Sequence, residues 1–338
     1  MAASPSFERA QRLPKTFAWI TVAIGAALFI VNMTVLLLPS LPHSEQMRSL
    51  YAQPAVWVPL LPRVLTVWLL AATLAWCHAR KALDERGAVR IAQLRGAGSR
   101  FAAVYLTAMV VNALALTPLF YRAQVLFMPG GPLHEHVGMY GLRSIMAASV
   151  LVQSVIQMLV IVGSVWLAAR FALRERGIAP VDASSAMPDP VAVSNRGAAA
   201  LVVAAIFVSL QMCISNIASG WVDLRDLDMV LLLLGWFAVP LLVCALAFWG
   251  AWLGAAPAPV QTHPFRAVAA AVSAFALLQA VCIAFAVGGL LWIASVSVSG
   301  RSSSGSLVML AIAMAAVYVV LLVVLVCAIT RRFYRRYL

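Results

Sequence analysis

The stretch GSLVMLAIAMAAVYVVLLVVLVCAIT, residues 305–330, decides the class of this protein. Its 26 residues include no Asp, Glu, Lys, Arg or His, and the basic segment RRFYRRYL follows directly at 331–338. A helix needs about 20 mostly apolar residues to cross the hydrocarbon core of a bilayer. The run therefore predicts a transmembrane helix that ends at a basic membrane surface.

The composition of the whole chain agrees with this class. Hydrophobic residues make up 64% of the 338 residues and charged residues only 10%, whereas a soluble domain carries roughly 25% charged residues. The net charge of +13 comes from basic residues placed between apolar runs rather than gathered in a soluble patch. The sequence therefore predicts an integral membrane protein whose partner is the lipid bilayer, and no nucleic-acid partner.

Eight apolar runs are long enough to span a membrane, which predicts an all-α, polytopic fold with eight transmembrane helices. The first run follows basic residues but is too long for a signal peptide and has no small-residue cleavage site, so it is expected to remain as an anchor. The runs cover residues 17–38, 57–78, 101–121, 144–169, 197–218, 229–254, 267–296 and 305–330.

The positions of lysine and arginine predict the orientation. Eighteen of them fall in the N-terminal tail, the even-numbered connections and the C-terminal tail, against six in the other connections. Basic residues are enriched on the cytosolic side, so both termini are expected in the cytosol of a bacterium, with the chain in its inner membrane. The five cysteines lie in or at the ends of apolar runs without a CxxC pair, so neither disulfides nor a zinc site is indicated.

An internal similarity predicts a repeated helix hairpin in the first half. ARKALDERG at 79–87 and ARFALRERG at 169–177 match at seven of nine positions, ninety residues apart, and Asn32 is echoed by Asn112. The alternative is that helix ends favour arginine and glycine in general. With the Pro- and Ser-rich linker 178–197, the pattern predicts two four-helix halves, 1–177 and 198–338.

Few polar groups occur deep within the predicted spans. No Asp, Glu, Lys or His lies at mid-depth, which argues against proton-coupled transport. Arg63 and Arg143 lie near the predicted outer surface and are expected to extend toward water. Asn32, Asn112, Gln153 and Gln157 form a candidate polar path for a neutral or zwitterionic substrate, and the alternative is hydrogen bonding between helices.

Other features of the spans predict helix packing. Trp68 and Trp236 lie deeper than the other tryptophans and are expected between helices. The Ala-rich seventh run and Gly250-Ala-Trp-Leu-Gly254 fit close contacts between helices.

One predicted outer loop carries residue types that bind metals. His134 and His136 lie in GPLHEHVGMYG at 131–141, and Asp226 and Asp228 belong to another outer loop. Imidazole and carboxylate ligands suit zinc or manganese, so a divalent-metal site is one hypothesis. A glycine-rich turn with solvated histidines is the other.

No catalytic motif or cofactor signature occurs in the chain, and no cofactor other than that divalent metal is expected. The connections between runs are too short for a soluble catalytic domain.

Two classes of function remain. The first is a non-enzymatic accessory subunit, scaffold or permease-like component for a neutral or zwitterionic small molecule, with a membrane-protein partner or a second copy. The second is a metal-dependent membrane enzyme that acts at the outer face on a lipid-linked substrate.

Overall fold

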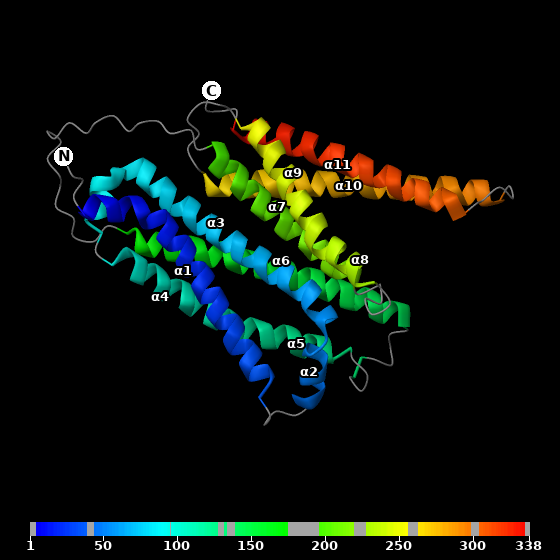
Figure 1. Ribbon diagram of the computed structural model, residues 1–338, viewed down its shortest axis with the longest axis horizontal. Coiled ribbons are helices and arrows are strands. Elements are labelled where there is room, and N and C mark those ends of the chain that lie inside the picture. Colours follow the sequence, from blue (N-terminus) through cyan, green and yellow to red (C-terminus); the bar gives the residue numbers. More distant parts are fainter. Residues whose placement is uncertain are drawn as a thin grey trace. The chain divides into compact units, whose positions relative to one another are not determined.

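The computed structural model of the chain describes residues 5–38, 44–94, 96–127, 132–133, 139–174, 196–219, 228–255, 263–298 and 304–334 (Figure 1). Within these ranges every secondary-structure element is a helix. The α-helices are α1 (Pro5–Leu36), α2 (Ser44–Tyr51), α3 (Pro54–Ala92), α4 (Ala97–Val111), α5 (Thr117–Val125), α6 (Met139–Ala172), α7 (Arg196–Ser219), α8 (Met229–Leu233), α9 (Val239–Gly254), α10 (Pro264–Val298) and α11 (Ser304–Tyr334).

Two of the long helices contain a π-helical segment. Segment η1 (Asn112–Leu116) joins α4 to α5, and η3 (Leu234–Ala238) joins α8 to α9. Each π segment adds a residue to the local turn without ending the helix. The third and sixth apolar runs are therefore continuous helices with one irregular turn each.

Eight helical segments in the described ranges are long and apolar enough to cross a membrane. This confirms the prediction of an all-α polytopic membrane protein with eight spans, one for each apolar run. The spans are Gln11–Leu36, Pro54–Gly87, Ala97–Phe120, Ala147–Ala172, Arg196–Ser215, Met229–Gly254, Pro264–Ser295 and Val308–Tyr334.

The chain folds into two compact units. Unit 1 comprises residues Met1–Val191 and Gln211–Pro240, and unit 2 comprises Ala192–Leu210 and Leu241–Leu338. Their boundaries fall within α7 and near the start of α9. Most of the expected linker at 178–197 lies outside the described residues, and the division into two four-helix halves stays a prediction.

In unit 1, α1 packs on α3 and α4, and α6 packs on the same two helices. At the start of α1 and α4 the Phe17 and Phe101 rings stack with their centroids 4.2 Å apart, and both side chains are fully buried. Buried residues of α3 lie mainly between Leu70 and Ala82, and those of α6 between Ile161 and Ala172. The helices are thus packed most tightly at their basic ends.

Trp68 packs between α1 and α3, as predicted. Its ring meets Phe29 edge-on at 6.3 Å between centroids. A Cβ atom at Gly25 would lie 2.7 Å from Trp68 Nε1, so the indole occupies the space that this glycine leaves. Trp236 is also buried, in an apolar cluster with Val58, Met212 and Leu232.

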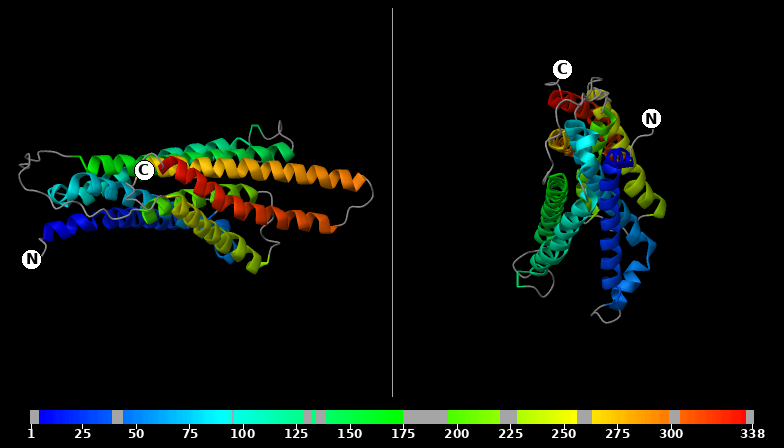
Figure 2. Two further views of the ribbon diagram at one scale, coloured as in Figure 1. Left: turned by 90° about the horizontal axis from the view of Figure 1, so that it is seen from above. Right: turned by 90° about the vertical axis from the view of Figure 1, so that its left-hand side faces the viewer.

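In unit 2, α10 and α11 lie side by side along much of their length (Figures 1 and 2). Small residues of α10 are packed inside the unit: Ala267, Ala270, Ala271 and Ala274 are all buried. Gly250 of α9 packs against α11, because a Cβ atom there would lie 2.9 Å from the carbonyl oxygen of Val323. The expected packing role of the Ala-rich helix and of the GxxxG motif is confirmed.

Gly87 ends the regular part of α3. Its φ of 75° and ψ of 157° lie outside the helical region, and α3 continues beyond this kink to Ala92. Residues with a side chain rarely adopt such a positive φ. Gly87 therefore bends the chain at the basic end of α3.

At the opposite end of unit 1, the short helix α2 closes the connection from α1 to α3. The Arg48 guanidinium donates to the carbonyl oxygen of Leu37 through Nε at 3.1 Å and Nη2 at 3.0 Å. Trp57 Nε1 donates to the carbonyl oxygen of Tyr51 at 2.7 Å. These bonds satisfy carbonyl groups at the ends of α1 and α2.

Candidate functional site

The expected metal ligands fall largely outside the described residues. The described ranges do not include His134, His136 or Asp226. They do include Asp228, which is exposed just before α8. In the parts of the chain that the structure describes, no group of three or more His, Cys, Asp or Glu side chains is arranged to hold a metal ion. The metal site stays a prediction.

The four residues of the expected polar path have different environments. Asn32 is exposed on α1, whereas Asn112, Gln153 and Gln157 are half-buried. Asn112 begins the π segment η1, and its carbonyl oxygen accepts a hydrogen bond from Thr117 Oγ1 at 3.3 Å. Among the described side chains no hydrogen bond joins any two of the four, and the path stays a prediction.

A polar cluster in unit 1 brings a charged residue next to a thiol and a hydroxyl. Arg63 of α3 is half-buried and lies within electrostatic range of the Cys213 thiol on α7. That thiol donates to Met158 Sδ at 3.9 Å, and the Ser154 hydroxyl on α6 lies within interaction range of it. We call Arg63, Ser154, Met158 and Cys213 the polar cluster.

Gln157 lies on the same face of α6 as Ser154 of the polar cluster. It follows Ser154 by three residues on α6, and residues three or four apart share a face of a helix. Gln153 is the direct neighbour of Ser154 along the chain and lies four residues before Gln157. Gln157 therefore adds an amide to the edge of the polar cluster, whereas Gln153 shares a face with Gln157 but not with Ser154.

The depth of Arg63 can be measured along α3. It lies six residues into the apolar run that begins at residue 57, which corresponds to about 9 Å at a rise of about 1.5 Å per residue. Within the described residues no carboxylate forms an ion pair with Arg63. A guanidinium at this depth is expensive in a membrane without polar neighbours or an anion.

The chemistry of the polar cluster is that of a binding site. Arg63 offers hydrogen-bond donors in a planar fork that matches a carboxylate or phosphate group. Ser154 and Gln157 can donate or accept hydrogen bonds, so they suit the polar part of a small molecule. Met158 adds an adaptable apolar surface.

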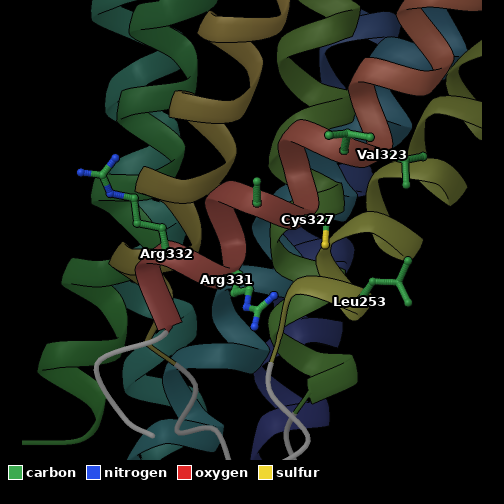
Figure 3. Close-up of a pocket in the computed structure, with 7 residues that line it drawn as sticks. Leu253, Val323, Cys327, Arg331 and Arg332 are labelled. Carbon is green, nitrogen blue, oxygen red and sulfur yellow. The ribbon is translucent and has the colours of Figure 1, made fainter.

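A groove in unit 2 provides an apolar surface that ends at basic residues. It has a volume of about 840 Å³ and is lined by Leu253 of α9 and by Val323, Val324, Cys327, Ala328, Arg331 and Arg332 of α11. Figure 3 shows Arg331 beside Cys327 and Leu253, whereas Arg332 extends away from them. This groove can accommodate an apolar chain beside a basic side chain at the membrane surface.

Sequence reasoning did not identify the polar cluster. The sequence predicted that Arg63 lies near the outer surface and extends to water, and it indicated neither a disulfide nor a zinc site at the five cysteines. The signal available was an arginine within an apolar run, which is a candidate functional residue by default. Its neighbours on α6 and α7 are far away in sequence, so only the packing of the helices reveals them.

Comparison with protein-family models, curated proteins and solved structures finds no match for this chain.

Proposed function

We propose that this chain is a multi-pass protein of a bacterial inner membrane that works without catalysing a reaction, as a permease-like or accessory component for a neutral or zwitterionic small molecule. The polar cluster carries the proposal, because it places a guanidinium, a hydroxyl and a thiol among membrane-spanning helices. Arg63 would receive the carboxylate or phosphate of a zwitterion. Gln153 and Gln157 would contact its remaining polar groups.

Thermal unfolding of the purified full chain in detergent tests binding at the polar cluster. The chain is heated alone and with glycine betaine, L-alanine, L-proline or glycerol, and the unfolding midpoint is recorded. A ligand at about 100 times its dissociation constant stabilises the folded state by about 2.7 kcal/mol. We expect at least one compound to raise the midpoint by several degrees.

Variants connect that shift to the polar cluster. Arg63→Gln removes the charge, and Gln153→Leu/Gln157→Leu removes the two amides. Both are expected to abolish the ligand-dependent shift. Arg122→Gln is the matched control, because Arg122 is exposed on α5. A ligand-dependent shift that persists in both variants, or the absence of a shift with every compound, would contradict the permease-like role.

The accessory role is tested by what stays bound to the protein. Native mass spectrometry of the gently extracted full chain is expected to show a membrane-protein partner or a second copy. The same spectra test the metal-dependent enzyme as the alternative function. A divalent metal that is lost in His134→Ala/His136→Ala would favour that enzyme over the accessory component.

A further inference from the structure

The basic ends of α3 and α6 enclose a recess lined by Arg86, Arg170, Phe171 and Arg174. We call these four residues the arginine recess. Both helices belong to unit 1 and end on the same side of it (Figure 1). The recess has a volume of about 490 Å³, within the range of roughly 300–1,000 Å³ that small-molecule pockets cover.

Arg86 ties the two helices together at this point. Its Nη1 donates to the carbonyl oxygen of Leu173, just after α6, at 2.6 Å. A cationic side chain on a terminal carbonyl is a favourable way to end a helix. The bond fixes Arg86 beside the C-terminal end of α6, where Arg170 lies in the last turn and Arg174 follows the helix.

The two similar segments of the sequence differ in charge here. In the first, Arg80 Nε pairs with Asp84 at 3.1 Å, and Lys81 Nζ pairs with Glu85 at 3.6 Å. In the second, Arg170 corresponds to Arg80, but Arg174 stands in the place of Asp84. An intrahelical ion pair in one segment is thus replaced by two like charges in the other.

Arg170 lies in the last turn of α6, and Arg174 follows two residues after the end of that helix. Arg170 and Arg174 are both exposed, and among the described residues neither is ion-paired with a carboxylate. Arg170 lies over the Trp166 ring, with Cζ 5.3 Å from the ring centroid, which orients its guanidinium. The third guanidinium, Arg86, lies in the same recess. This concentration of positive charge is favourable once an anion with several oxygen atoms occupies it.

A phosphate group has the chemistry that this recess recognises. Guanidinium groups bind phosphate oxygens through parallel N–H donors, and arginine is favoured where such recognition occurs. Phe171, 45% exposed in the same recess, gives one wall an apolar surface. Basic pockets between membrane helices commonly bind phospholipid headgroups.

We propose that the arginine recess binds a phosphate group, carried either by an anionic phospholipid headgroup or by free phosphate. The observations that carry the proposal are the convergence of Arg86, Arg170 and Arg174 and the replacement of the Asp84 equivalent by arginine. Binding neutralises the repulsion between Arg170 and Arg174 and holds the ends of α3 and α6 together. The proposal does not depend on ligand binding at the polar cluster.

The test measures stability and binding of the full chain in detergent. Unfolding midpoints are recorded with short-chain phosphatidylglycerol, with short-chain phosphatidylcholine and with sodium phosphate, at constant ionic strength adjusted with sodium chloride. We expect phosphatidylglycerol or phosphate to raise the midpoint, and phosphatidylcholine to have a smaller effect. A rise with the lipid alone identifies a headgroup site, and a rise with phosphate as well identifies a site open to free phosphate.

Variants separate this site from general charge attraction. Arg170→Gln and Arg174→Gln are each expected to weaken binding about fivefold, from the contribution of about 1 kcal/mol per basic residue near an anionic surface. Arg174→Asp replaces a positive charge by a negative one and is expected to weaken binding more. Arg80→Gln is the control, because Arg80 is paired with Asp84 and does not line the recess.

Two results would overturn the proposal. One is a wild-type chain whose midpoint responds to neither phosphatidylglycerol nor phosphate. The other is equal loss of binding in Arg80→Gln and in the Arg170 and Arg174 variants, because that would show a diffuse charge effect. Since the wild-type measurement alone can give the first result, the proposal remains falsifiable even if a variant fails to fold.

Discussion

Arg196 shows how one side chain at a helix end joins two helices of unit 2. Its guanidinium carbon lies 4.0 Å from the centroid of the Trp252 ring. Its Nε also donates a hydrogen bond to the Trp252 carbonyl oxygen. The same residue thus holds the start of α7 against the end of α9 through a cation–π contact and a charged hydrogen bond.

Replacement of Arg196 by alanine is expected to lower stability. A cation–π contact at an exposed site contributes about 0.5–1 kcal/mol, and a hydrogen bond to a charged group about 1.5–3 kcal/mol. We expect a total loss of roughly 2–4 kcal/mol, seen as a lower unfolding midpoint in detergent. Arg196→Lys should recover only part of it, since lysine keeps the charge but lacks the planar fork.

A suitable comparison for Arg196 is Arg122→Ala, which removes an exposed arginine from α5. Its midpoint is expected to stay close to that of the wild type. If Arg196→Ala unfolds at the same temperature as Arg122→Ala, the contact with Trp252 contributes nothing measurable to stability.

At the scale of elements, the packing of α9 on α11 depends on two glycines. A Cβ atom at Gly254 would collide with the carbonyl oxygen of Cys327, and one at Gly250 would lie 2.9 Å from that of Val323. Backbone atoms cannot move aside as flexible side chains do. The two helices can therefore approach this closely only because both positions lack a side chain.

Gly254→Ala is expected to force α9 and α11 apart. Overpacking of this kind typically costs about 1–3 kcal/mol, so the unfolding midpoint in detergent should fall. Gly288→Ala is the matched control on α10, because nothing lies within 4 Å of the Cβ position there. The control should be neutral or slightly stabilising, since alanine favours helix more than glycine does. Equal midpoints for the two variants would disprove the tight contact.

The sequence predicted the eight membrane-spanning helices better than it predicted which side chains meet between them. All eight spans follow from the length of the apolar runs, because a bilayer demands about 20 apolar residues wherever a helix crosses it. Helix α2 was not predicted, because its eight residues are mostly polar and too few to span a membrane, and nothing in the apolar runs marks the two π segments. The polar cluster was missed because the rotation of α6 and α7 about their axes decides which side chains meet. Sequence spacing alone does not give that rotation.

At the scale of the whole molecule, each unit has a long helix whose buried residues lie mostly toward its basic end. In unit 2 the buried residues of α11 are Leu322, Val326, Thr330 and Tyr334, all near its basic end. In unit 1 the buried part of α3 likewise leads up to Arg80 and Arg86. Most of the buried residues of α3 and α11 thus lie toward the basic ends of these helices, whereas Val58 near the start of α3 belongs to the buried cluster around Trp236.

The orientation of the chain is the prediction that belongs to this scale. An even number of spans brings both ends of the chain to one side, and the excess of basic residues at those ends predicts that this side is the cytosol. Alkaline phosphatase, which is active only outside the cytosol, should be inactive when fused after residue 338. The same enzyme should be active when fused after residue 125, between the third and fourth spans.

The strength of the charge bias makes a sharper test possible. Replacement of the four arginines in RRFYRRYL by glutamine leaves fourteen basic residues inside against six outside, so the orientation is expected to remain unchanged. The fusion after residue 338 should stay inactive in that variant. Active phosphatase at residue 338 in the wild-type chain would reverse the predicted topology and would place the arginine recess on the outer side. Phosphatase that is active at residue 338 only in the glutamine variant would give a different result. It would mean that these four arginines, rather than the excess of basic residues over the whole chain, determine the orientation of the last span.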